Sequence, residues 1–193
     1  MTHQAIIAII AAALDVFASS LYIIDTIKGK TKPNRVTYLL WGVPIIAAIA
    51  TNSTGFTWSS LYVFACGFMP LTIFFVSFTN KNSYWRLKKF DYICGAFAIL
   101  ALILWLTTKN ATVAIIFSII ADFLAGLPTL IKIFKHPETE TIKTYAICLF
   151  GQVLNLFAIK TWHFTEFAFP IYLVIFTSML VLAPHLKHRS TPK

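Results

Sequence analysis

Two carboxylates stand inside long apolar stretches of this 193-residue sequence. Asp15 lies within "AIIAIIAAALDVFASSLYIIDTI", and Asp122 lies within "IIADFLAGLPTLIKIF". A carboxylate at the centre of a membrane costs about 2.5–3.5 kcal/mol on insertion scales, so it should face other helices or a polar cavity. Such a group either binds a proton, cation or polar solute, or pins one helix to another by hydrogen bonding. The sequence leaves both roles open.

Each carboxylate shares a helical face with small or polar residues. Ser19 lies four residues after Asp15, and Thr129 lies seven residues after Asp122, spacings that place side chains on one face of a helix. An aromatic ring and two amides in other apolar stretches are expected to supply stacking and hydrogen-bonding walls. The predicted substrate-binding residues are therefore Asp15, Ser19, Trp41, Asp122, Thr129, Gln152 and Asn155.

Other chemistry finds little support in the sequence. The apolar stretches contain no set of nucleophile, base and orienting residue, so an enzyme is not expected. The sequence has no GxxxxGK[ST] nucleotide motif and no HExxH or similar metal-ligand spacing, and its three cysteines have no CxxC spacing. We expect neither a cofactor nor a metal.

Composition places the chain in a membrane. Hydrophobic residues make up 58% of the sequence and charged residues 12%, far from the values of soluble domains. The apolar stretches are long enough to cross about 30 Å of hydrocarbon, and turn-rich loops separate them, which favours helices over a barrel. We expect an all-α membrane protein with seven transmembrane helices, at 5–27, 36–51, 58–79, 92–108, 112–134, 144–159 and 166–184.

The basic residues predict the orientation of these helices. If the N-terminus is outside and the C-terminus cytoplasmic, fourteen of the sixteen lysines and arginines are cytoplasmic, and only Lys109 and Lys160 are outside. The net charge of +9 then reflects topology in a multi-pass protein of the cell membrane, and no nucleic acid is expected as a partner. The expected partners are a small-molecule solute and the lipid bilayer, and a homo-oligomer stays open.

The sequence also matches itself at an offset of 107 residues. Asp15 aligns with Asp122, and Tyr38 aligns with Tyr145. The matches predict two three-helix repeats, at 5–79 and 112–184, joined by a linker helix at 92–108. Because the linker adds one crossing, the two repeats should be parallel, with a cavity at their interface, as in transporters built from repeats.

The second helix of each predicted repeat is short. The segment at 36–51 contains Gly42 and Pro44, and the segment at 144–159 contains Gly151. We expect both helices to be interrupted at these residues. Short or broken helices at matching positions of two halves indicate a transporter site, although glycine and proline are also common in ordinary membrane helices.

The 3+1+3 arrangement, together with "LPTLIKIFKHPETETI", in which Pro128 precedes a basic loop, resembles the PQ-loop superfamily, which includes the SWEET-like (MtN3-like) transporters. The resemblance implies a carrier or facilitator that moves a small polar solute by alternating access between the two bundles. A ligand-binding membrane receptor on the same scaffold, similar in helix arrangement to KDEL-type sorting receptors, is the alternative. Uptake into sealed vesicles would separate these two functions.

Overall fold

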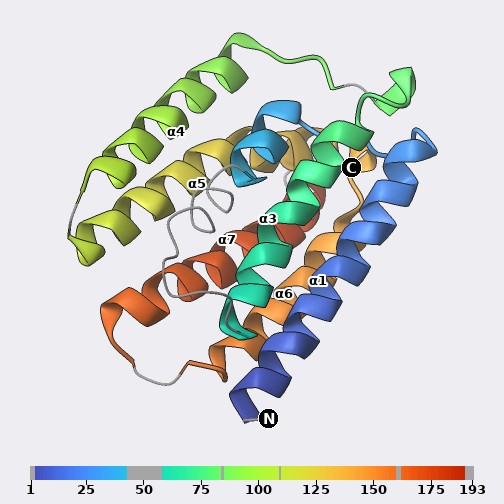
Figure 1. Ribbon diagram of the computed structural model, residues 1–193. Coiled ribbons are helices and arrows are strands. Elements are labelled where there is room, and N and C mark those ends of the chain that lie inside the picture. Colours follow the sequence, from blue (N-terminus) through green and yellow to red (C-terminus); the bar gives the residue numbers. More distant parts are fainter. Residues whose placement is uncertain (1–2, 43–57, 84, 109, 160–161, 190–193) are drawn as a thin grey trace.

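The computed structural model is a bundle of long helices (Figure 1). It describes residues 3–42, 58–83, 85–108, 110–159 and 162–189. Residues 35–42 are helical as well. The other elements are α1 (His3–Ile27), α3 (Trp58–Val76), η1 (Lys81–Ser83), α4 (Lys89–Thr107), α5 (Ala111–Lys135), η2 (Pro137–Thr139), α6 (Ile142–Leu156) and α7 (Phe164–Arg189).

The all-α prediction is confirmed, since the described residues form helices, turns and loops and contain no strand. Within the described residues, three helical stretches are long and apolar enough to cross a membrane: His3–Ile27, Ile115–Lys135 and Phe167–Leu186. Large apolar side chains also cover the outside of the bundle; on α4 alone Phe97, Ile103 and Leu106 are more than half exposed. Such a surface suits lipid rather than water.

The observed helix ends differ from the predicted ones by a few residues. Lys89 is the first residue of α4 and Lys135 the last residue of α5. Lysine is tolerated at the end of a membrane helix because its long side chain can extend toward the membrane surface. The predicted helix at 36–51 corresponds to the helix at 35–42 as far as the structure describes it. Pro44, and with it the expected interruption there, lies outside the described residues.

The expected interruption at Gly151 was wrong. Helix α6 runs from Ile142 to Leu156 without a break. A Cβ atom added at Gly151 would lie 3.4 Å from the carbonyl oxygen of Ala11 on α1, an ordinary contact. Gly151 therefore stands in a continuous helix that has room for a larger side chain.

The packing order of the helices has a repeating pattern. Helix α1 packs against α3 and α6, while α5 packs against α4 and α7, and α6 also packs against α7. The contact of α1 with α3 thus resembles the contact of α5 with α7. Figure 1 shows α1, α3 and α6 side by side, with α4 on the outside of α5. Small residues line the contact around α4 and α5, as is usual between membrane helices: Ala98, Ala101, Ala121 and Ala125.

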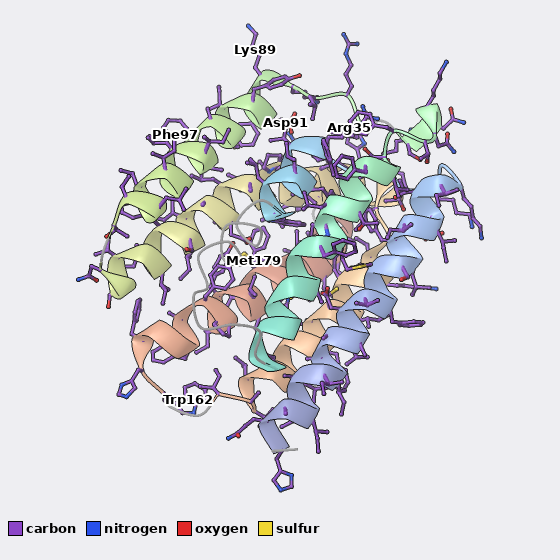
Figure 2. The ribbon with its side chains drawn as sticks, in the orientation of Figure 1. Arg35, Lys89, Asp91, Phe97, Trp162 and Met179 are labelled. Atoms are coloured by element: carbon purple, nitrogen blue, oxygen red, sulfur yellow. The ribbon has the colours of Figure 1, made fainter. Side chains whose placement is uncertain are left out.

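One end of the bundle, formed by the connections at 28–34, 77–88 and 136–141, is held by polar contacts; we call it the basic end. Arg35 donates to the Ser77 hydroxyl at 2.9 Å and to the Ser77 carbonyl at 2.7 Å. Asn34 accepts from the backbone N–H of Thr37 and donates to Asp91 at 2.6 Å, so it joins the start of the 35–42 helix to the start of α4. In Figure 2, Arg35 and Asp91 lie at this end and Trp162 at the opposite one.

Candidate solute-binding site

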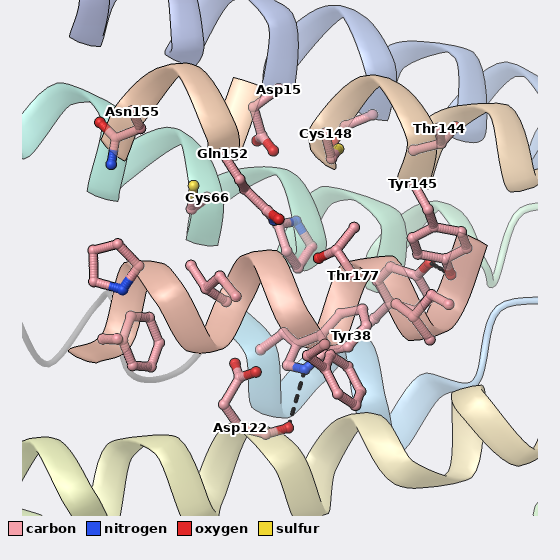
Figure 3. A pocket seen from close by; sticks show the side chains of 18 of the residues that line it. Asp15, Tyr38, Cys66, Asp122, Thr144, Tyr145, Cys148, Gln152, Asn155 and Thr177 are labelled. Atoms are coloured by element: carbon pink, nitrogen blue, oxygen red, sulfur yellow. Dashed lines mark hydrogen bonds between the residues drawn. The ribbon is translucent and has the colours of Figure 1, made fainter. Parts of the chain in front are cut away.

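A cavity of about 350 Å³ lies inside the bundle (Figure 3). The 35–42 helix and α1, α3, α5, α6 and α7 all contribute to its wall. Its volume lies within the range of small-molecule sites. The lining residues that can form hydrogen bonds through their side chains are Asp15, Ser19, Tyr38, Trp41, Cys66, Ser118, Asp122, Thr144, Tyr145, Cys148, Gln152, Asn155 and Thr177.

Asp122 is held in the wall by contacts from two other helices. Its Oδ2 atom accepts a hydrogen bond of 2.8 Å from the Tyr172 hydroxyl of α7. Trp41 Nε1 donates to the Asp122 carbonyl oxygen at 3.4 Å. The Trp41 ring meets Phe176 edge-on, with ring centroids 6.4 Å apart. The carboxylate is thus fixed beside an aromatic wall.

Asp15 enters the same cavity from α1. The side chain of Cys148 on α6 neighbours its carboxylate. Among the buried side-chain atoms of the described residues, two acceptors lack any hydrogen-bond partner within the chain, Asp15 Oδ2 and Gln152 Oε1. Figure 3 shows Asp15, Cys148 and Gln152 on one side of α7 and Asp122 on the other. Two unpaired acceptors in one cavity favour a ligand with hydrogen-bond donors.

The surroundings of the two carboxylates correspond through the sequence offset. Trp41 contacts Asp122, and Cys148 contacts Asp15. An offset of 107 residues converts 15 into 122 and 41 into 148. In the first case a residue of the 35–42 helix reaches α5, and in the second a residue of α6 reaches α1. The cavity is therefore lined by residues from widely separated parts of the sequence, from Asp15 to Leu180.

Tyrosine hydroxyls mark the end of the cavity nearest the basic end. The hydroxyls of Tyr38 and Tyr145, both lining residues, are 2.8 Å apart. Tyr145 also donates to Glu140 Oε2 at 3.0 Å, and Tyr22 donates to the same oxygen at 2.6 Å. Glu140 directly follows η2. Its carboxylate therefore connects the tyrosine hydroxyls to the loop at 136–141 of the basic end.

A buried ion pair lies next to these tyrosines, between the cavity and the basic end. Lys132 Nζ contacts Glu140 Oε1, and the two side chains are 1% and 0% exposed. The same ammonium group donates to the Lys32 carbonyl and lies 4.9 Å from the centre of the Trp85 ring. Each charge therefore has hydrogen-bonding partners, as a buried ion pair requires. Together, Tyr22, Tyr38, Lys132, Glu140 and Tyr145 form what we call the tyrosine–glutamate cluster.

The structure brings six of the seven predicted substrate-binding residues to the cavity: Asp15, Ser19, Trp41, Asp122, Gln152 and Asn155. Thr129 is not among its lining residues. It is fully buried and donates to the Thr37 hydroxyl at 3.0 Å. Seven residues of helix carry it about 10 Å from Asp122 along α5, so it packs beyond the cavity.

Sequence reasoning missed Glu140 and Tyr172. Glu140 lies in the polar stretch "HPETET", where an acid is expected to face water, and Tyr172 carries no spacing signal. Tyr38 and Tyr145 were recognised as repeat matches but not as neighbours. Their identity at equivalent positions was the available signal.

No group of three or more His, Cys, Asp or Glu side chains with the geometry of a metal site occurs in the part of the chain that the structure describes. Comparison of the chain with protein-family models, with curated proteins and with solved structures finds no match. Fold and cavity together define an all-α protein with helices long and apolar enough to span a membrane, and with an internal cavity whose largely apolar wall carries several polar groups.

Proposed function

We propose that the protein is a membrane carrier that moves a small polar solute by alternating access between two three-helix units. The observation that carries this proposal is the cavity, which both halves line with a carboxylate and which the Tyr38–Tyr145 contact bounds toward the basic end. Carriers built from repeats bind their solute at such an interface.

The packing order supports the 3+1+3 division into 5–79, 92–108 and 112–184. Contacts of α1 with α3 and of α5 with α7 are equivalent under the repeat, while α4 packs outside α5. Seven crossings with the N-terminus outside would place the basic end in the cytoplasm. The resemblance to the PQ-loop superfamily points to the same arrangement.

The contacts suggest how such a carrier would open. Rocking the halves apart at the basic end would separate Tyr38 from Tyr145 and Glu140 from Tyr22, and would leave Glu140 with Tyr145 and Lys132. The contact between the halves at the basic end thus comprises several hydrogen bonds together with ring packing, and a transport cycle would have to break and re-form them. The carboxylates would then be reached from the cytoplasm.

Reversible cross-linking tests this proposal. In a chain whose three cysteines are replaced by alanine, Tyr38→Cys and Tyr145→Cys would be joined by a methanethiosulfonate cross-linker in proteoliposomes. A panel of labelled sugars, amino acids and small amines supplies the solute. We expect uptake to stop on cross-linking and to return on reduction, while each single-cysteine chain keeps its uptake after treatment. Uptake through the cross-linked chain would refute alternating access, and binding without uptake would favour the receptor alternative.

A further inference from the structure

We infer that the cavity recognises a solute carrying a protonated amine, and this inference rests on the proposed function. Two carboxylates, Asp15 and Asp122, line one space of about 350 Å³. The lining residues described include no lysine, arginine or histidine, although the chain has a net charge of +9. A protein rich in cations thus keeps them away from its internal site, which would repel an anion and attract a cation.

The unpaired acceptors give the inference its chemical detail. Asp15 Oδ2 and Gln152 Oε1 are both shielded from solvent and both lack a donor within the described chain. Unpaired buried acceptors are costly, and an ammonium group has three donors and no acceptor. It can therefore satisfy several such oxygens at once, whereas a hydroxyl supplies one donor.

The rest of the wall suits the same ligand. Trp41, Phe176 and Tyr172 form a continuous aromatic series, with Tyr172 stacked on Phe176 at a centroid distance of 5.8 Å. Aromatic faces attract organic cations and also pack against an apolar body. Trp41 and Phe176 line the cavity directly. The structure therefore favours a small organic ammonium compound over a sugar or a carboxylic acid.

A matched set of probes tests this inference on the purified full-length chain in detergent. The set is 2-phenylethylamine, 2-phenylethanol and phenylacetate, with butylamine, butanol and butyrate as an aliphatic set. At pH 7 only the amines are cations. We expect each amine to raise the melting temperature saturably, and the neutral and anionic members to bind at least about tenfold more weakly, the factor expected for a charge-assisted hydrogen bond. An equal response to a neutral or anionic member, or no response to either amine at millimolar concentration, overturns the inference.

Variants localise the response. Asp15→Asn and Asp122→Asn should each weaken amine binding about tenfold or more. Asp25→Asn is the matched control, because Asp25 lies on α1 near the basic end, where it accepts from the Thr141 hydroxyl at 2.9 Å; its amine affinity should be unchanged. An amine affinity unchanged in both folded cavity variants overturns the inference. If a variant does not fold, the wild-type probe comparison still decides.

Different experimental results would refute the carrier function and the recognition of an amine. Amine binding without uptake of any panel solute in proteoliposomes would refute the carrier and leave the amine site in place. Cross-link-sensitive uptake of a neutral solute, unaffected by Asp15→Asn, would support the carrier and refute amine recognition.

Discussion

The hydroxyl groups of Tyr38 and Tyr145 lie 2.8 Å apart although 107 residues separate them. That separation equals the offset at which the sequence matches itself. Contact between equivalent positions of two copies occurs where a two-fold axis passes between them, as in an isologous interface. The tyrosine pair would then mark the axis that relates the halves.

Tyr38 and Tyr145 play different roles in their shared hydrogen bond. Each hydroxyl has one proton, and Tyr145 gives its proton to Glu140, so Tyr38 must donate to Tyr145. Tyr38→Phe removes one hydrogen bond and should cost about 0.5–1.5 kcal/mol. Tyr145→Phe leaves Tyr38 without an acceptor and also removes one of the donors to Glu140, so we expect a larger cost, about 1–3 kcal/mol. Thermal unfolding in detergent measures both costs, and equal losses would contradict this proton assignment.

The Lys132–Glu140 pair should behave as a buried ion pair. Lys132→Met leaves a buried carboxylate without its cation and should destabilise the protein by about 3–5 kcal/mol. The double variant Lys132→Met/Glu140→Gln removes both charges, and Gln can still accept from the tyrosines. We expect it to recover much of the loss in a double-mutant cycle. Additive losses would show that the two groups act independently.

Two helical glycines offer a matched comparison. A Cβ atom at Gly126 would lie 2.5 Å from the Phe176 ring and 2.9 Å from Trp41, so Gly126→Ala must displace cavity walls and should cost about 1–3 kcal/mol. At Gly151 the nearest atom would be 3.4 Å away, an ordinary contact. We expect Gly151→Ala to be near neutral, since alanine also favours the helix. Thermal unfolding and solute binding should therefore change in the first variant only.

Labelling of single cysteines in intact cells tests the orientation. In a background with Cys66, Cys94 and Cys148 replaced by alanine, a cysteine at Lys30 or Lys81 should react with an impermeant maleimide only after the cells are permeabilised. A cysteine at Lys109 or Lys160 should react in intact cells. The opposite pattern would overturn the orientation predicted from the basic residues.

Much of this arrangement could be predicted from the sequence, because a membrane helix requires a long continuous run of apolar residues. Continuous apolar runs gave the helices within a few residues, and a charge inside such a run must face inward, which is why Asp15 and Asp122 were found at the cavity. The spacing of Asp122 and Thr129 predicted that they share a face of α5, but it did not predict how far along the helix the cavity extends. Thr129 therefore lies beyond the cavity. Glu140 could not be predicted because its burial depends on a loop folding back onto tyrosines from other helices.

The pairing of Asp15 with Cys148 also bears on how the chain is synthesised. The first helix leaves the ribosome long before α6 exists, so Asp15 must enter the bilayer without the neighbour it will later have. Its cost of about 2.5–3.5 kcal/mol at that moment falls on α1 alone. The most apolar 18-residue window of that helix has a mean hydropathy of 2.2, which can offset one charged residue. The strongly apolar composition of α1 thus serves biosynthesis, by carrying a carboxylate into the membrane before its partner arrives.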